Sequence, residues 1–189
     1  MKGVILAGGK SKRMGQDKAL ISVGGESLIF HVYKAFKHQV NEIVISGSQD
    51  YNTGLQVISD DPDGPKGPVG ALYSIWKYRE QTTESGFFTV PVDAPHIPEN
   101  LCERLYGNKS AIATTPNRTH QAFAWWLYDD LTELFENLNS DNSISLGRIS
   151  RMCKARHVLW ADETLFYNIN TPNDLSRYLT DIAPAYRAY

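Results

Sequence analysis

Residues 2–18 read KGVILAGGKSKRMGQDK, a short apolar run followed at once by a glycine-rich and strongly basic segment. The run at 2–6 has the composition of a buried β-strand. The segment after it contains Gly8, Gly9 and Gly15, and glycine lets the backbone approach a ligand closely. A glycine-rich turn directly after the first strand of an α/β sheet is a common nucleotide-binding element. This stretch therefore predicts both a fold class and a nucleotide site.

Apolar runs and amphipathic stretches alternate along the rest of the first half. Continuous apolar runs, typical of parallel strands covered on both faces, predict strands at 41–46, 55–58 and 87–92. Apolar residues at the helical period predict helices at 28–36, 69–76 and 101–106. A chain that alternates strand and helix from its first residue favours an α/β fold with a doubly wound, mostly parallel sheet and right-handed crossovers.

The second half is less regular. Strands are expected at 111–113, 121–127, 158–160 and 166–169, and the period-two pattern of 121–127 indicates an antiparallel addition. A helix is expected at 131–138. A last helix is expected after Thr171, with Pro172 at its first position and Asp174 three residues after the cap. Its expected apolar face is Leu175, Tyr178, Leu179 and Ile182.

Length and charge limit the classes of function. The 189 residues predict one domain over 1–189, with a nucleotide-binding half at 1–100 and an acceptor-binding half at 101–189. The formal net charge is −2, which disfavours a nucleic-acid-binding protein. Four cations lie close together and predict a local anion site: Lys10, Lys12, Arg13 and Lys18.

Two further features predict a cytoplasmic protein without a membrane segment. Apolar runs stay well short of the roughly 18 residues that span a bilayer. Cys102 and Cys153 stand in neither a metal-binding nor a redox spacing, so we expect both to be reduced.

Two better-known phosphate-binding motifs are excluded. A P-loop requires four residues between its glycines and then Lys-Ser/Thr, whereas five residues separate Gly9 from Gly15 and Gln16 follows. The dinucleotide fingerprint Gly-x-Gly-x-x-Gly does not fit the adjacent pair Gly8-Gly9.

The segment at 6–18 resembles the signature of nucleotidyltransferases that activate small molecules, and most closely that of the molybdenum cofactor guanylyltransferases, the MobA proteins. Their pattern Leu-Ala-Gly-Gly-x-x-x-Arg-Met-Gly, followed by Asp-Lys, is present in full. Three later segments are similar to further motifs of that family, in the same order: GPVGAL at 67–72, PVDAPHIP at 91–98 and NINTPNDL at 168–175. Related cytidylyltransferases usually carry Ala where Gly8 stands, so the resemblance favours GTP.

The resemblance implies a Rossmann-like nucleotidyltransferase fold and a Mg²⁺-dependent reaction. In that reaction GMP passes from GTP to molybdenum-molybdopterin, giving the molybdopterin guanine dinucleotide and pyrophosphate. The implied partners are GTP, molybdopterin and, transiently, cofactor-delivery proteins and molybdoenzymes.

The same resemblance implies catalytic roles for Arg13, Lys18 and Asp93, with Asp93 as the magnesium ligand. An arginine fork can bind phosphate oxygens in pairs, whereas a lysine acts as a compact point charge. Magnesium is usually held by one or two carboxylates together with phosphates. The implied nucleotide-binding residues are Leu6, Ala7, Gly8, Gly9, Lys18, Ser46, Asp60 and Asp93.

Several positions leave alternatives open. Asp60 is suited to accept hydrogen bonds from guanine, but Asp61 beside it makes the register uncertain by one residue. Ser46 stands where the family often has Asn, and a hydroxyl lacks the two-sided hydrogen bonding of an amide. The implied acceptor-binding residues are Asn168 and Asn170. Asn170 is also a candidate second metal ligand, or a plain residue of the turn before the last helix.

His120, Arg148 and Arg151 are further candidates for acceptor contacts. A buried structural role explains the histidine equally well, and an exposed helix face explains the two arginines.

Two other functions are compatible with the sequence. One is a cytidylyl- or sugar-nucleotide transferase of the same fold. The other is a non-catalytic GTP-binding assembly module, which the presence of Arg13, Lys18 and Asp93 together disfavours because such a module does not need all three.

Overall fold

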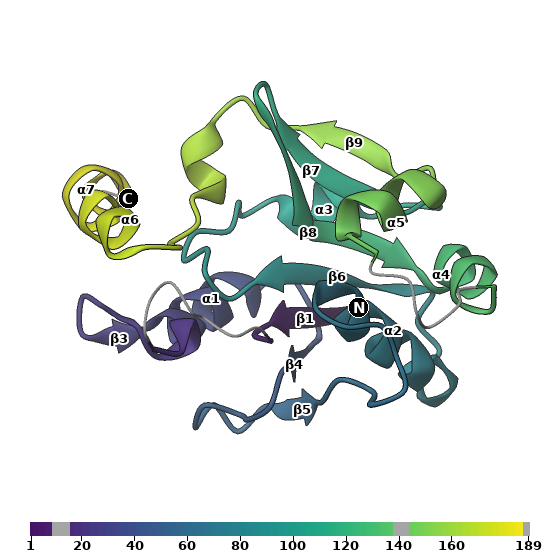
Figure 1. Ribbon diagram of the computed structural model, residues 1–189. Coiled ribbons are helices and arrows are strands. Elements are labelled where there is room, and N and C mark those ends of the chain that lie inside the picture. The colour runs from purple at the N-terminus through teal and green to yellow at the C-terminus, as the bar shows by residue number, and fades with distance from the viewer. Residues whose placement is uncertain (9–15, 138–143, 187–189) are drawn as a thin grey trace.

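The sheet at the centre of the molecule has seven strands in the order β5-β4-β1-β6-β8-β7-β9 (Figure 1), counted over residues 1–8, 16–137 and 144–186, which this computed structural model describes. Its parallel part consists of β1 (Lys2–Leu6), β4 (Glu42–Ser46), β5 (Gln56–Ile58) and β6 (Gly86–Pro91). The remaining strands are β7 (Ala111–Thr115), β8 (Arg118–Leu127) and β9 (Arg156–Leu159). Strand β8 runs antiparallel to both β6 and β7. The expected antiparallel addition is therefore confirmed.

Helices cover both faces of the sheet. One face packs against α1 (Leu28–Phe36) and α3 (Leu101–Leu105). The other packs against α2 (Pro68–Lys77), α4 (Tyr128–Phe135) and α5 (Leu146–Met152). Successive side chains of a strand point to opposite faces, so Val4 and Ile5 of β1 belong to different apolar clusters. This two-sided burial explains the continuous apolar runs and confirms the doubly wound fold.

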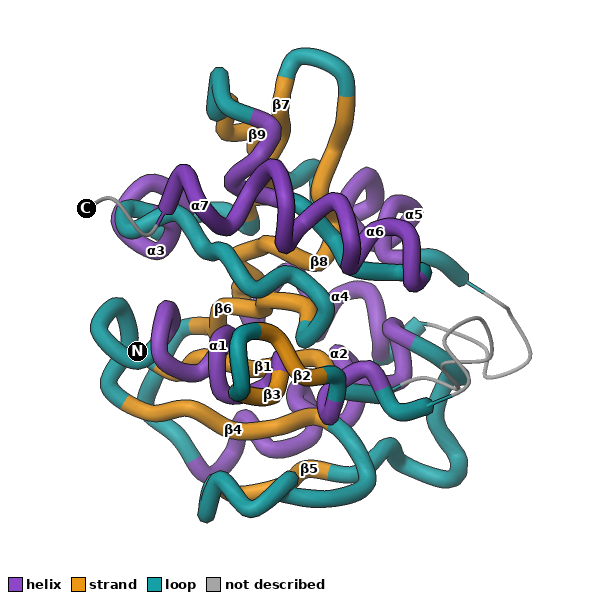
Figure 2. The backbone as a smooth tube through the Cα atoms, turned by 90° about the vertical axis from the view of Figure 1, so that its left-hand side faces the viewer, coloured by secondary structure: helices purple, strands orange, loops and turns teal. Residues whose placement is uncertain are grey.

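The adjacent residues Trp125 and Trp126 show that the second half shares this core. Both are fully buried, on opposite faces of β8. Each indole N–H is satisfied: Trp125 Nε1 donates to the carbonyl of Gly107 at 3.0 Å and Trp126 Nε1 to Oγ1 of Thr89 at 3.0 Å. Both halves of the chain therefore form one sheet, which in Figure 2 has β5 at one end and β7 and β9 at the other.

A small hairpin, β2 (Ser22–Val23) with β3 (Glu26–Ser27), precedes α1 and was not expected from the sequence. It packs with the C-terminal helices α6 (Pro172–Arg177) and α7 (Ala183–Tyr186) in a third apolar cluster. The turn between the strands is possible because Gly24 and Gly25 adopt positive φ values of 61° and 93°.

Two sequence-based expectations were wrong. Residues 166–169 do not form a strand; the 3₁₀ turn Glu163–Phe166 is followed by irregular backbone, and Phe166 packs against Phe123 and Trp160. The aromatic residue there anchors the core without joining the sheet. Leu179, expected on the apolar face, is 40% exposed, whereas Tyr178 and Ile182 at the two ends of the same π-turn, Tyr178–Ile182, are buried.

The helix expected at 131–138 begins earlier, at Tyr128, and Leu138 lies outside the described residues. Across the described parts of the chain, no helix combines the length and apolar character needed to cross a membrane.

Candidate active site

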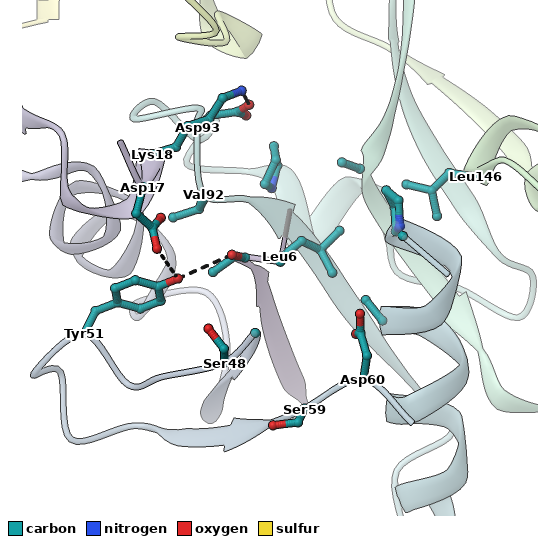
Figure 3. A pocket seen from close by; sticks show the side chains of 18 residues that line it. Leu6, Asp17, Lys18, Ser48, Tyr51, Ser59, Asp60, Val92, Asp93 and Leu146 are labelled. Carbon is teal, nitrogen blue, oxygen red and sulfur yellow. Dashed lines mark hydrogen bonds and ion pairs between the residues drawn. The ribbon is translucent and has the colours of Figure 1, made fainter. Parts of the chain in front are cut away.

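A cavity of about 760 Å³ lies at the carboxyl edge of the parallel strands. The segments that leave β1, β4, β5 and β6 supply its walls, because parallel strands all end at the same edge of a sheet. Figure 3 shows side chains from these segments around the opening. Its volume is within the range of about 300–1,000 Å³ found for small-molecule sites. Six predicted site residues line it: Leu6, Ala7, Gly8, Lys18, Asp60 and Asp93.

The second half of the chain also reaches this cavity. Ala122 of β8 and Leu146 at the start of α5 line its wall, together with Gly67 and Pro68 at the start of α2. The cavity therefore joins the strand ends of the first half to the antiparallel part of the sheet.

Two polar side chains, Lys18 and Asn168, bind the carboxylate of Asp93, and Lys18 links it to Asn170. The ammonium group of Lys18 donates to Oδ2 of Asp93 at 2.8 Å and to Oδ1 of Asn170 at 2.6 Å. The amide of Asn168 donates to Oδ1 of Asp93 at 2.6 Å. We call these four residues the Lys18–Asp93 cluster. The side chains of Lys18 and Asp93 are only 20% and 15% exposed, so solvent screens their attraction weakly.

The start of α6 fixes the two asparagines. The carboxylate of Asp174 accepts the backbone N–H of Asn170 at 3.0 Å and of Thr171 at 2.8 Å, and Thr171 Oγ1 accepts the N–H of Asp174. This is the expected capping box. Between the asparagines, the N–H of Ile169 donates to the carbonyl of Asp93 at 2.8 Å. The turn-and-cap role of Asn170 is therefore confirmed for its backbone, and its side-chain oxygen accepts from Lys18. Its role as a metal ligand stays a prediction.

Tyr51, which sequence reasoning missed, organises the other side of the cavity. Its hydroxyl donates to Oδ2 of Asp17 at 3.1 Å and lies 3.4 Å from the carbonyl oxygen of Ala7 (Figure 3). Asp17 in turn accepts the N–H of Ala19 at 3.0 Å and so caps the 3₁₀ turn Lys18–Leu20. Burial, and then the charge of Asp17, raise the pKa of Tyr51 to about 12, which keeps the hydroxyl protonated as a donor.

A sequence signal for Tyr51 did exist. Residues 50–54, DYNTG, lie shortly after the predicted strand at 41–46, and they have the composition of a tight turn. In the structure Tyr51 and Asn52 both adopt positive φ, 54° and 60°. Positive φ is uncommon for residues other than glycine, and in this turn it accompanies a tyrosine that lies in the cavity wall.

The structure distinguishes Asp60 from its neighbour Asp61. Asp60 lines the cavity, and partial burial by the surrounding walls raises the pKa of its carboxyl, opposed by the positive charge of Lys66. Asp61 points to α2, where Lys77 donates to its Oδ2 at 2.6 Å. This hydrogen bond holds the pKa of Asp61 below its usual value. Asp60 is therefore the carboxylate that a ligand in the cavity can reach.

Two glycines allow the backbone to hold Asp60 beside α2. Gly67 precedes the helix with a φ of 75°, which favours glycine. A Cβ atom at Gly70 would lie 2.3 Å from the carbonyl oxygen of Pro65 and 3.7 Å from Cγ of Asp60. Only glycine at position 70 lets this segment pass so closely over the first turn of α2.

Ser46 ends β4 at the same sheet edge but is not among the residues that line the cavity. It is fully buried, and its hydroxyl has no hydrogen-bond partner among the described residues. Its carbonyl oxygen accepts the N–H of Ala7 at 2.8 Å and so positions the start of the glycine-rich segment. A contact between the Ser46 hydroxyl and a nucleotide stays a prediction. Gly9 and Arg13 lie outside the described residues.

The structure places His120 in the core. Its ring stacks on Phe166 with centroids 4.5 Å apart, and Nε2 lies 3.1 Å from Oγ1 of Thr115. Burial lowers the pKa of His120 to about 4. Arg148 and Arg151 are exposed on α5.

The residues present suit a hard cation that is shared with a ligand. No group of three or more His, Cys, Asp or Glu side chains able to hold a metal occurs within the described ranges. Asp93 and Asn170 nevertheless turn two oxygen atoms toward one cation, the Lys18 ammonium. One carboxylate supplemented by other oxygens matches the way that magnesium is bound beside phosphates.

A doubly wound sheet with a cavity at the carboxyl ends of its parallel strands, rimmed by an ammonium group and a carboxylate, defines a nucleotide-binding α/β protein. Residues 3–158 match the family model of the MobA-like NTP transferase domain. The molybdenum cofactor guanylyltransferase of Cereibacter sphaeroides is 32% identical over 183 residues, covering 93% of each chain. The protein of the same name from Yersinia pestis (strain Pestoides F) is 36% identical over 183 residues, covering 91% of each chain. The chain belongs to the MobA-like NTP transferase family and is a nucleotidyltransferase.

A solved structure confirms the fold. Molybdopterin-guanine dinucleotide biosynthesis protein A from Archaeoglobus fulgidus superposes with a TM-score of 0.74 at 20% sequence identity, over 98% of this chain and 100% of that chain.

Proposed function

We propose that this protein transfers GMP from GTP to molybdenum-molybdopterin, giving the molybdopterin guanine dinucleotide and pyrophosphate. The observation that carries the proposal is the Lys18–Asp93 cluster at the rim of the nucleotide-sized cavity. The two relatives described above, which match nearly the whole chain, are both named molybdenum cofactor guanylyltransferase.

The reaction requires positioning and charge neutralisation. A phosphate oxygen of the acceptor forms a bond to the α-phosphorus of GTP while the bond from that phosphorus to the pyrophosphate oxygen breaks. The protein must align two anions and stabilise the charge that develops between them. Lys18 supplies a positive charge within the cavity, and Arg13 is proposed to supply a second from the glycine-rich segment.

Guanine selection is assigned to Asp60, with Gly8 providing space. A carboxylate can accept hydrogen bonds from both the ring N–H and the exocyclic amino group of guanine. A Cβ atom at Gly8 would come no closer than 4.0 Å to a described neighbour, the carbonyl oxygen of Ser46. We propose that the missing side chain at position 8 leaves room for the purine, as the resemblance to the guanylyltransferases implies.

We further propose that magnesium is the cofactor, held by Asp93 and Asn170. Their oxygens already converge on a cation. When bound, magnesium would neutralise phosphate charge during the transfer. Around it, Asn168 orients the Asp93 carboxylate through the 2.6 Å hydrogen bond, and α6 fixes Asn170.

The acceptor is proposed to enter from the side of Ala122 and Leu146, where the second half lines the cavity. Contact of Asn168 with the acceptor stays a prediction from the family resemblance. So do a cytoplasmic location and contacts with cofactor-delivery proteins and molybdoenzymes.

The test measures pyrophosphate release. The protein is incubated with Mg²⁺, molybdenum-molybdopterin and each of the four nucleoside triphosphates in turn, with reactions lacking Mg²⁺ or acceptor as controls. We expect release with GTP that depends on both. Preference for CTP would contradict the guanylyl assignment. Tight GTP binding without pyrophosphate release would support a non-catalytic binding module instead.

A further inference from the structure

The ammonium group of Lys18 lies between the two side chains assigned above to the metal. We propose that Lys18 is a resident cation that holds the metal site in the nucleotide-free enzyme and leaves it for the triphosphate when the metal enters. This inference rests on the proposed function. It goes beyond that function because it couples metal binding to nucleotide binding through one side chain.

The hydrogen bonds show that Lys18 uses the same oxygen atoms that a metal would use. Its Nζ lies 2.8 Å from Asp93 Oδ2 and 2.6 Å from Asn170 Oδ1. Magnesium binds oxygens at about 2.0–2.1 Å, so the ion and the ammonium group cannot occupy this position together. The second carboxylate oxygen of Asp93 is already hydrogen-bonded to Asn168.

The charge balance makes the exchange depend on the nucleotide. Lys18 and Asp93 neutralise one another in a partly buried position. A divalent cation that entered alone would displace the ammonium group and remain close to it, and like charges at short range repel. A triphosphate changes this balance because it gives Lys18 a new anionic partner.

The position of Lys18 allows such a movement. The residue itself lines the cavity, so its side chain can turn to a phosphate while its backbone stays in place. The backbone is held by the cap that Asp17 forms on the 3₁₀ turn, with the Tyr51 hydroxyl on the same carboxylate. A lysine suits this exchange because its charge sits on a long flexible stem.

The experiment titrates Mn²⁺ into nucleotide-free protein and measures its affinity by calorimetry, with free Mn²⁺ counted by electron paramagnetic resonance. We expect the Lys18→Met variant to bind one Mn²⁺ about tenfold more tightly than the wild type or better, because the competing charge is gone. Adding Asp93→Asn to this variant should abolish the gain. Lys34→Met, which removes an exposed lysine of α1 that is paired with Glu26 of β3, should leave the affinity unchanged.

Equal Mn²⁺ affinity in wild type and Lys18→Met, or a gain that survives Asp93→Asn, would overturn the inference. Lys18→Gln is measured in parallel, and melting temperatures show that each variant is folded. The titration contains neither nucleotide nor acceptor. Its outcome is therefore separate from the pyrophosphate assay, in which the proposed function succeeds or fails on its own.

Discussion

The ammonium nitrogen of Lys18 lies 2.8 Å from Oδ2 of Asp93, although 75 positions separate the two residues in the sequence. The pairing follows from sheet topology. Strands β1 and β6 are parallel neighbours, with Leu6 opposite Pro91. Lys18 follows the end of β1 and Asp93 follows the end of β6, so both are brought to one edge of the sheet.

Replacing Asp93 should nearly abolish activity. Asp93→Ala removes the carboxylate at the centre of the Lys18–Asp93 cluster, and we expect kcat for pyrophosphate release to fall more than about a hundredfold. Asp129→Ala, an exposed aspartate on α4, is the matched control and should retain wild-type turnover. Near-normal turnover of Asp93→Ala would refute its assignment.

The two adjacent aspartates should behave differently. Asp60→Ala removes the carboxylate that lines the cavity. A hydrogen bond to a charged group contributes about 1.5–3 kcal/mol, so its loss should raise KM for GTP about tenfold to a hundredfold. Preference for GTP over the other nucleotides should narrow. Asp61→Ala removes a carboxylate that binds Lys77 and the N–H of Asp63 and does not line the cavity, so KM should stay nearly unchanged. Steady-state kinetics with each nucleotide check this, and the reverse pattern would assign base recognition to Asp61.

Tyr51→Phe should weaken both the fold and nucleotide binding. The variant keeps the buried ring but removes the hydroxyl that donates to Asp17, a change worth about 0.5–1.5 kcal/mol of the free energy of unfolding. KM for GTP should rise because Asp17 loses one of the contacts that fix the turn bearing Lys18. Urea denaturation and kinetics measure the two effects. Tyr78→Phe, at a tyrosine that is 36% exposed, is the control; if both variants matched the wild type, Tyr51 would have no positioning role.

Stability should fall in mild acid because of two histidines, His120, which is buried, and His96, which is half-buried. Burial lowers the pKa of His96 and of His120 to about 4, against about 6.5 in an unfolded chain. Between these values the unfolded state binds more protons, so the contribution is fully present above pH 6.5 and is lost as the pH falls toward 4. The expected loss is about 2 kcal/mol per imidazole at pH 5.

Urea denaturation at pH 7 and pH 5 measures this loss. His120→Phe keeps an aromatic ring against Phe166 without a titrating group, and it should reduce the pH dependence by about half if the two imidazoles contribute equally. Arg118 and Glu163 both act on His120, in opposite directions. His157→Gln, at an exposed position on β9, should leave the pH dependence as it is in the wild type. An unchanged slope in His120→Phe would show that His120 is not responsible.

Features that depend on residues close together in the sequence could be predicted from residue types alone. Two-sided burial requires continuous apolar runs, so β1, β4 and β6 could be predicted closely. The capping box of α6 involves only Thr171 and Asp174, three residues apart, and it was predicted and confirmed. Asp93 could be placed at the cavity because it follows a predicted parallel strand.

Which of these residues contact one another, and which point away, depends on the packing of segments that are distant in the sequence. Asp60 and Asp61 are equivalent in sequence, and the position of Lys77 on α2 separates them. The π-turn that contains the exposed Leu179 lies within a residue pattern that predicts a regular helix. The contacts of Tyr51 with Asp17 and of Asn168 with Asp93 join segments 34 and 75 positions apart. Contacts between residues so far apart in the sequence depend on how the sheet is assembled and how helices pack on it. A local pattern of residue types cannot predict them.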